Sequence, residues 1–478
     1  MANPLFTKKP MSVLMQESDS SGHGLKRTLG RFNLITLGIG AIIGAGIFVL
    51  TGQAAAIYAG PAVSISFIVA GFACAFAGLC YAEFASMIPI AGSAYTYAYA
   101  TMGRLVAWII GWALILEYLF SGSTVAVGWS GYVVNFLDSI GLHLPSALTS
   151  APIGLDETNN LVFTGSIINL PAVFIVFCVT ILLFRGIKES ASFNNIVVIV
   201  KLTVIILFIL LGWQYINQEN WHPFIPDNTG TFGQFGWSGV MRASSVIFFA
   251  YVGFDAVSTA AQEAKNPQRD MPWGILGSLV ICTVIYIIVS LVMTGIANYT
   301  ELNTSAPIAV AIDKTDLKWF SPLIKIGAIA GLSSVILVML MGQTRIFYSM
   351  SNDGLFFKPF GKIHPKYQTP YIATLVTGGV ALTTSGLLPI GILGELVSFG
   401  TLLAFIIVCA GILILRYEQP DLKRPFKTPL FPVVPILGIL SCLGVMFSLN
   451  TLILKIALGW IMLGLIIYYF YGRKYAKY

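Results

Sequence analysis

Long apolar runs dominate the chain, and short polar segments separate them. A helix needs about 20 apolar residues to cross a bilayer, and the runs that reach or approach this length have the approximate limits 32–57, 61–88, 103–136, 166–185, 190–214, 237–262, 272–297, 320–350, 371–388, 391–416, 432–450 and 453–472. The pattern predicts an all-α polytopic membrane protein with 12 transmembrane helices. The runs 103–136 and 320–350 each fit one long tilted helix, or a helix plus an interfacial piece.

The polar segments divide the chain into regions. We expect a tail at 1–31, five helices in 32–214, five more in 237–416, two in 432–472 and a short tail at 473–478. The connections between the apolar runs are too short to hold a separate soluble domain with its own core. The fold is therefore expected to lie almost entirely within the bilayer.

The charges set the expected orientation. Charged residues make up 10% of the chain, against about 25% in soluble proteins. The connections 137–165 and 215–236 contain no Lys or Arg, whereas the alternate connections and both tails carry most of the 27. Because basic connections face the cytoplasm, we expect both termini in the cytoplasm and the protein in the cell membrane. The net charge of +7 then reflects topology and does not indicate nucleic-acid binding.

The first apolar run contains a glycine-rich stretch, Gly38–Phe48, with glycines at 38, 40, 44 and 46. Each glycine costs about 1 kcal/mol relative to alanine inside a helix. A break in hydrocarbon is tolerated only where other groups satisfy the freed backbone. The stretch is therefore either a close helix–helix contact or an interrupted helix beside a cavity.

The sixth run contains a second such stretch, Phe248–Ala256, with Gly253 two residues before Asp255. Runs one and six are five apart, and an odd offset makes the two five-helix halves inverted. Paired interrupted helices in inverted halves indicate a transporter's binding site. One half-helix end offers free N–H groups to a carboxylate, and another offers free carbonyl groups to an ammonium. An α-amino acid carries both groups.

The motifs at these places resemble those of the amino acid–polyamine–organocation (APC) superfamily. Gly40–Phe48 resembles its first helix, and Tyr81–Tyr95 (YAEFASMIPIAGSAY) resembles its second-to-third-helix signature. The segments Gly253–Val257 and Glu263–Pro272 resemble the cationic amino acid transporters and their bacterial relatives. The resemblance covers about residues 25 to 475. It implies a LeuT-like fold, in which a 5+5 inverted repeat is followed by two further helices and helices 1 and 6 are interrupted.

The resemblance also implies a substrate site. Its carboxylate would meet the N–H groups of Ala45 and Gly46, with Gly44 providing the turn and Ile43 also at the site. The substrate amino group would meet backbone carbonyls at the two breaks, namely those of Ile42, Phe249, Ala250 and Val252. Phe249 corresponds to an aromatic gate over the substrate, and Asp255 to an acidic position below the second break.

Lys201 lies deep in the fifth run. Burial disfavours the charged form of a lysine, so such a group can change protonation near neutral pH. The resemblance implies that this ammonium takes the place of a sodium ion between helices one and eight. Ser333 and Ser334 are its expected hydroxyl partners, together with the carbonyl of Ile43. The alternative is a lysine held in a permanent structural ion pair.

Glu117 and Tyr118 lie near the middle of the third run. A carboxyl group at this depth is a functional candidate, and Tyr118 either lines the same pocket or is a structural aromatic residue. If Glu117 pairs with Arg242, the pocket is neutral and suits small or branched apolar amino acids. If Glu117 is free, it suits lysine, arginine or ornithine.

Other ionisable residues have structural interpretations. Glu83 is a gate or a scaffold ion pair. Glu263, Lys265 and Arg269 are expected in inner-gate pairs. Glu395 is expected to be a solvated edge residue.

The sequence favours a secondary active amino acid transporter that takes up an L-α-amino acid with a proton by alternating access. An exchanger, a cationic amino acid or polyamine transporter and a passive channel are the alternatives. The chain lacks His-Glu-x-x-His and Gly-Lys-Ser/Thr motifs, and its six cysteines lack metal-ligand spacing, so we expect no enzyme activity, cofactor or metal. Expected partners are the amino acid, protons and membrane lipid, and a small single-helix partner protein is left open.

Overall fold

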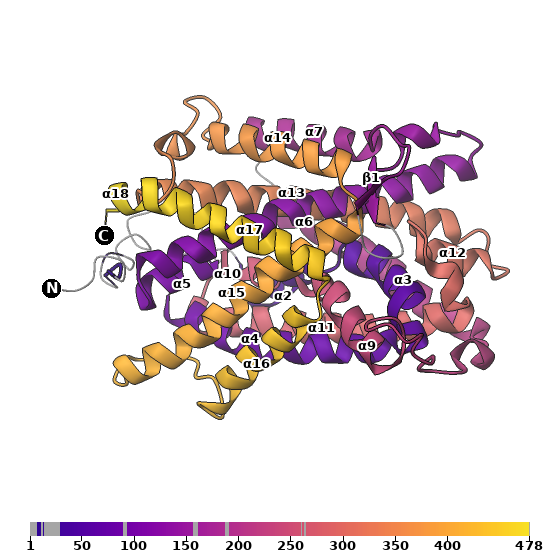
Figure 1. Cartoon of the computed structure of the whole chain (residues 1–478), viewed down its shortest axis with the longest axis horizontal. Helices are drawn as coiled ribbons and strands as arrows, with labels where there is room; N and C mark the ends of the chain where they lie inside the picture. Colours follow the sequence, from indigo (N-terminus) through magenta and orange to yellow (C-terminus); the bar gives the residue numbers. More distant parts are fainter. Residues whose placement is uncertain are drawn as a thin grey trace.

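The computed structural model of the chain describes residues 7–10, 13, 29–88, 93–155, 161–186, 191–259, 261 and 264–477. It is a bundle of helices that run largely along one direction (Figure 1). In its first part, the α-helices are α2 (Arg31–Ile42), α3 (Thr51–Ala54), α4 (Val63–Met87), α5 (Ser93–Thr101), α6 (Arg104–Ser139), α7 (Leu170–Arg185) and α8 (Ala191–Gly212). In its second part, they are α9 (Gly236–Ile247), α10 (Ala256–Thr259), α11 (Pro267–Ile296), α12 (Pro307–Asp313), α13 (Ser321–Asn352), α14 (Tyr371–Leu387), α15 (Ile390–Glu418), α16 (Val433–Phe447), α17 (Thr451–Ile467) and α18 (Arg473–Tyr475). A small antiparallel hairpin, β1 (Ile153–Leu155) and β2 (Leu161–Phe163), lies in the connection between α6 and α7.

Within the described residues, 8 helical segments are long and apolar enough to cross a membrane, and four shorter apolar helices accompany them. The chain is therefore a helical polytopic membrane protein, as predicted. One of the long segments, Gly46–Met87, has 42 residues and would be about 63 Å long if straight. Gly60 has a φ of 61° and precedes Pro61, so the helix is interrupted there, close to the predicted boundary between the first two spans. The number of 12 crossings stays a prediction.

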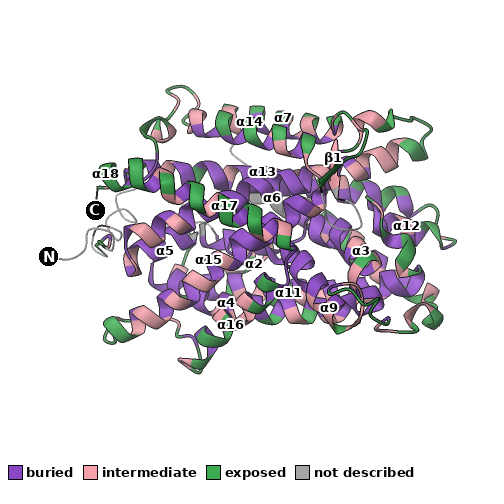
Figure 2. Ribbon diagram, viewed as in Figure 1, coloured by how far each residue is buried: buried purple, intermediate pink, exposed green. Residues whose placement is uncertain are grey.

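The helices nearest the centre are α6 and the segment Gly236–Ser258. They bury 83% and 94% of their most apolar stretches, whereas the stretch in Thr451–Tyr475 buries 22%. Figure 2 shows α6 and α13 mostly buried and α17 largely exposed. α6 packs against both α13 and α15, and α11 packs against α2 and α4. This arrangement places the second predicted break in the middle of the bundle.

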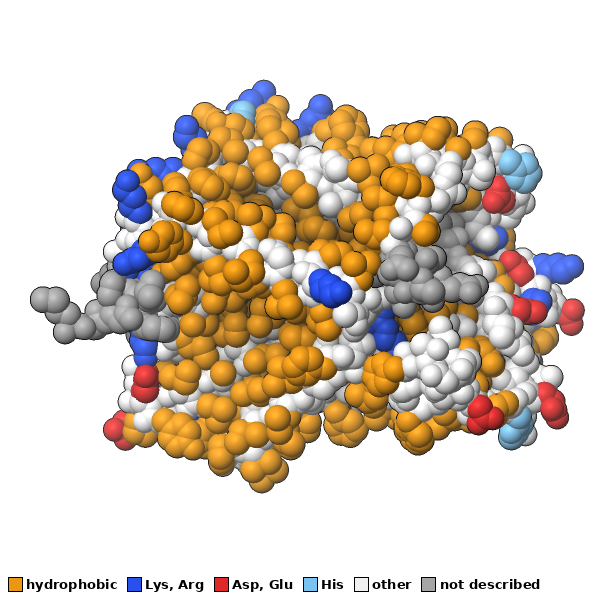
Figure 3. Space-filling view, viewed as in Figure 1, with side chains coloured by type: hydrophobic (Ala, Val, Ile, Leu, Met, Phe, Trp, Pro, Cys, Tyr) orange, Lys and Arg blue, Asp and Glu red, His pale blue; other side chains and the backbone are white. Residues whose placement is uncertain are grey.

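The described residues nearest the two ends of the chain lie together at one end of the bundle. The Nζ atom of Lys9 lies 2.7 Å from Oδ1 of Asp353, and the amide of Lys477 donates to the carbonyl of the same residue at 3.0 Å. Figure 3 shows Lys and Arg side chains at this end of the visible face and most of the Asp and Glu side chains at the other. The shared side of the termini agrees with the prediction, and their cytoplasmic location stays a prediction.

Candidate functional site

Both predicted breaks are present. α2 ends at Ile42, residues 43–44 leave the helix, and a π-helical turn begins at Gly46. α9 ends at Ile247, a 3₁₀ turn covers Phe248–Tyr251, and α10 begins at Ala256. Gly253 adopts a φ of 119°, which only glycine accepts readily. The first N–H groups after such a break have no acceptor within their own helix.

The two breaks lie directly against each other. A Cβ atom added to Gly46 would stand 2.3 Å from Cα of Ala250. A Cβ atom added to Gly253 would stand 2.9 Å from the carbonyl carbon of Ala41. Both values are far below ordinary contact distances, so the two backbones touch only because these positions are glycines. The sequence interpretation of an interrupted helix and that of a close contact therefore both apply.

Tyr286 of α11 joins the two breaks. Its hydroxyl oxygen lies 2.9 Å from the carbonyl oxygen of Ile42 and 3.0 Å from that of Ala250. These are two of the carbonyls that we predicted for the substrate amino group. Sequence reasoning missed Tyr286, although a tyrosine inside a long apolar run needs a partner for its hydroxyl group and is a recognisable signal.

The predicted binding residues at the breaks are closed to solvent in this conformation. The exposed fraction is 4% for Phe249 and smaller for the others, namely Ile42, Ile43, Ala45, Ala250 and Val252. Gly44 and Gly46 are also buried. A substrate at this site would be enclosed, and the binding roles of these residues stay predictions.

Lys201 of α8 reaches the first break. Its Nζ atom lies 2.5 Å from the carbonyl oxygen of Gly40 and 3.0 Å from that of Ile43. The contact with Ile43 is the one that the sequence predicted. The alkyl chain packs on α13, where a Cβ atom at Gly331 would lie 3.3 Å from Cδ of Lys201.

The two serines expected beside Lys201 bind elsewhere. Ser333 donates to the carbonyl of Ile329 and accepts from Nε1 of Trp129 at 2.9 Å. Ser334 donates to the carbonyl of Gly331 at 2.9 Å. Serine hydroxyls in a helix often bond to a carbonyl of the preceding turn, as both do here. Their role beside Lys201, which the resemblance implies, stays a prediction.

Glu117 lies in a buried cluster of polar groups between α6, the second break and α15. Its carboxyl group lies next to the carboxyl group of Asp255 and the hydroxyl group of Thr401. The Tyr118 hydroxyl donates to Oδ2 of Asp255 at 2.6 Å. All of these side chains are buried. The three predicted site residues Glu117, Tyr118 and Asp255 therefore lie together. The first two come from α6, and Asp255 comes from the second break.

The predicted alternative of a Glu117–Arg242 pair is wrong. Arg242 instead pairs with Glu395 at 2.5 Å, and its guanidinium lies 5.0 Å from the ring centroid of Tyr58. Glu395 is 4% exposed and also accepts from the amide of Asn450 at 3.0 Å. The expectation that Glu395 is a solvated edge residue is therefore also wrong. A buried charge requires a partner, and Arg242 from the distant helix α9 supplies it.

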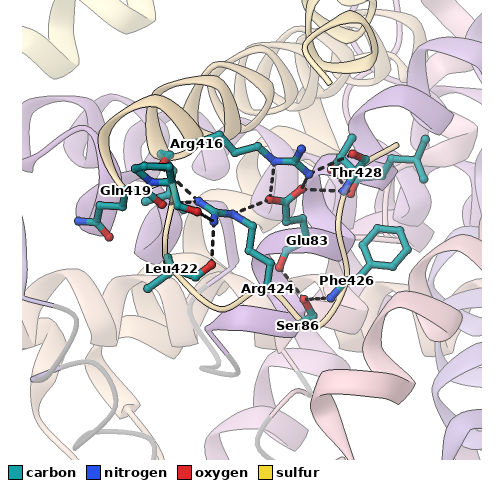
Figure 4. Close-up of polar contacts among 11 residues, drawn as sticks. Glu83, Ser86, Arg416, Gln419, Leu422, Arg424, Phe426 and Thr428 are labelled. Carbon is teal, nitrogen blue, oxygen red and sulfur yellow. Dashed lines mark hydrogen bonds and ion pairs between the residues drawn. The ribbon is translucent and has the colours of Figure 1, made fainter. Parts of the chain in front are cut away.

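Glu83 of α4 lies at the centre of a network of ion pairs and hydrogen bonds, and whether this network is a gate or a scaffold stays a prediction. Its carboxylate accepts from Arg416 and from the amide of Thr428 at 2.7 Å, and Arg424 lies 3.3 Å away. Figure 4 shows these contacts drawing the connection after α15 onto α4. Among the inner-gate candidates, Glu263 lies outside the described residues, and the Arg269 side chain is exposed.

Comparison with known proteins identifies the family. The profile of the family described as "Amino acid permease" matches residues 29–471. The chain belongs to this family. This chain is 47% identical over its whole length to the branched-chain amino acid permease BcaP of Bacillus subtilis, and the match covers 99% of that protein.

Other relatives have different substrates in their names. The permease is 45% identical to the methylthioribose transporter of Bacillus subtilis, covering 99% of this chain and 98% of that protein. It is 36% identical to the vacuolar cationic amino acid transporter 4 of Arabidopsis thaliana, covering 88% of this chain and 68% of that protein. The predicted resemblance to the APC superfamily is confirmed, and the family is one of permeases rather than enzymes.

Proposed function

We propose that this amino acid permease takes up an L-α-amino acid with an apolar side chain together with a proton. The observation that most supports this proposal is that two interrupted helices contact each other in the buried centre of the bundle, where Gly46 lies against Ala250. The Tyr286 hydroxyl lies between the carbonyls of Ile42 and Ala250 at this contact. The ammonium group of a zwitterion can take the place of the Tyr286 hydroxyl at those two carbonyls. Its carboxylate can then face the amides of Ala45 and Gly46.

The proposed architecture is the LeuT-like one. Twelve crossings form two inverted five-helix repeats, 32–214 and 237–416, followed by two helices in 432–472. Alternating access then exposes the breaks to one side of the membrane at a time. The protein lies in the cell membrane with both termini in the cytoplasm, as the distribution of basic residues favours.

The preference for an apolar side chain rests on the surroundings of Glu117. Its carboxyl group neighbours Asp255 and Thr401. Glu117 and Asp255 are both buried, and Asp255 also accepts from the Tyr118 hydroxyl. Because these polar neighbours enclose Glu117, its carboxyl group is not open to the ammonium group of a lysine or ornithine side chain. The 47% identity to a branched-chain amino acid permease supports the same preference.

The proposed proton site is Lys201. A charged ammonium donates three hydrogen bonds and has two carbonyls of the first break, Gly40 and Ile43, within reach. Loss of the proton weakens that grip on the end of α2. The protonation state of Lys201 is thereby coupled to the conformation of the helix that holds the substrate.

The test is uptake of labelled leucine into proteoliposomes with and without an inward proton gradient. We expect gradient-driven accumulation, competition by isoleucine and valine, and little competition by lysine or ornithine. Accumulation that requires an amino acid inside the vesicles would instead identify an exchanger. Equilibration without accumulation would identify a facilitator, and competition by lysine alone would reject the proposed substrate class.

A further inference from the structure

An apolar groove lies on the outside of the bundle, away from the two breaks. Its volume is about 780 Å³, and it is formed by α2, α11 and the connection after α15. From α11 it takes residues between Gln268 and Ile281, from α2 it takes Ile35, and from the connection it takes Pro425 and Phe426.

The groove matches the depth of one leaflet. The distance along α11 from Arg269 to Ile281 is about 18 Å at 1.5 Å per residue, and half of the hydrocarbon core is about 15 Å. The middle and far end are apolar, with Leu276, Val280 and Ile281 on the lining. An acyl chain that runs from the polar surface towards the midplane fits this shape.

The polar end of the groove carries a positive charge. Arg269 and Gln268 line it, and both side chains are exposed. Asp270, next to Arg269, is buried and lies 3.7 Å from the guanidinium of Arg31. In the described part of the chain, Arg269 has no carboxylate within ion-pair distance. Trp273 is 55% exposed at the same end, as is common for tryptophan at the membrane interface.

The walls of the groove are held in place. A Cβ atom at Gly274 would lie 2.8 Å from Cβ of Leu34, so α11 and α2 are in close contact. The third wall is fixed to α4, because the amide of Phe426 donates to the Ser86 hydroxyl at 3.3 Å, next to the Glu83 contacts (Figure 4). The groove is thus a preformed feature of the surface.

We infer that this groove binds an anionic phospholipid, with its phosphate at Arg269 and Gln268 and one acyl chain along α11. The charge complementarity at the rim and the length of the apolar part both favour this occupant. Because Ile35 belongs to α2, the lipid also braces the helix that ends at the first break. Lipid binding should therefore stabilise the closed arrangement.

The test is the thermal stability of the purified full-length protein in detergent, with phosphatidylglycerol or phosphatidylcholine added. We expect phosphatidylglycerol to raise the melting temperature more, and soluble glycerol phosphate to have no effect. Arg269→Gln should weaken the apparent affinity for phosphatidylglycerol by about fivefold. Arg185→Gln is the control, because Arg185 is also an exposed basic residue but does not line the groove.

A second pair of variants tests the apolar part. Val280→Trp should fill the groove and abolish the difference between the two lipids. Val284→Trp should keep it, because Val284 is 50% exposed on the same helix and lies outside the lining residues. Equal shifts by both lipids, or an unchanged response in Arg269→Gln and Val280→Trp, would overturn the proposal.

Mass spectrometry of the protein taken directly from its membrane identifies the natural occupant. A phospholipid adduct that Val280→Trp loses and Val284→Trp retains is the expected result. A small protein bound in place of lipid and lost in the same variant would overturn the proposal. Neither measurement requires transport, so failure here would leave the proposed function untouched.

Discussion

At the scale of single residues, glycines two positions apart in the first break make different demands. Gly46 faces the backbone of Ala250, where an added Cβ atom would lie 2.3 Å from Cα. Gly44 faces side chains, and its nearest contact would be Cγ1 of Val335 at 3.5 Å. The sequence marked both as part of one glycine-rich stretch. Only the position of the second break separates their roles.

We predict that Gly46→Ala abolishes most transport while Gly44→Ala retains it. The added methyl group at 46 must push the two breaks apart, and such overpacking costs about 1–3 kcal/mol. A cost of this size in the transport cycle slows it by about fivefold to over 100-fold. The measurement is uptake normalised to the amount of protein in the membrane. Equal activity of the two variants would show that the contact with Ala250 is not needed.

Lys201 carries the second prediction at this scale. Lys201→Ala and Lys201→Met should remove the dependence of uptake on external pH while the protein still reaches the membrane. The physical reason is that the Lys201 ammonium binds the carbonyls of Gly40 and Ile43. Its hydrogen bonds to them depend on its protonation, and neither alanine nor methionine can replace them. Lys455→Ala is the control, because Lys455 is exposed on α17. Proton-driven uptake that survives in both Lys201 variants would contradict the role.

At the scale of elements, buried ion pairs connect helices that are far apart in the sequence. Arg242 of α9 and Glu395 of α15 form one such pair, and Glu395 also accepts from the backbone amide of Asn450, which precedes α17. Tyr286 makes a neutral tie between α11 and the two breaks. The sequence revealed which residues are costly to bury but not their partners, because partner choice depends on how the helices are arranged.

We predict that the buried Arg242–Glu395 ion pair contributes to the stability of the folded protein. Glu395→Ala leaves a buried guanidinium without its carboxylate, and breaking such a pair costs about 3–5 kcal/mol. We expect a clearly lower melting temperature in detergent. Glu301→Ala should change it little, because the Glu301–Lys314 pair is about half exposed and such pairs contribute about 1 kcal/mol or less. Similar shifts in the two variants would contradict a structural role for the buried pair.

At the scale of the whole molecule, the chain is a helical membrane protein with its two described ends at Asp353. The positions of the polar connections follow from hydropathy, and the basic residues favour one orientation. The proposed twelve-crossing topology predicts that the connection 137–165 is external and that the connection after α13 is internal.

Cysteine labelling tests this topology. In a variant without the native cysteines, Leu144→Cys should react with an impermeant maleimide in intact cells. Lys362→Cys should react only after permeabilisation, although both positions are exposed. Labelling of both positions from outside, or of Lys362→Cys alone, would reject the proposed orientation.

The sequence by itself determined the membrane class, the helical content and the places where two helices break. These follow from local properties, because apolar length, glycine content and charge distribution act on each segment separately. The family motifs added the APC assignment. Lys201 was identified because a lysine is conspicuous in an apolar run, and its carbonyl partner at Ile43 was predicted with it.

Only the tertiary structure decided which groups meet. It placed Gly46 against Ala250, brought Glu117 to Asp255 rather than to Arg242, and gave Ser333 and Ser334 other partners than Lys201. It also brought the Tyr286 hydroxyl to both breaks. The physical reason is that a buried polar group binds whatever compatible group packing brings within about 3 Å. That neighbour is set by the crossing of helices, which no single segment encodes.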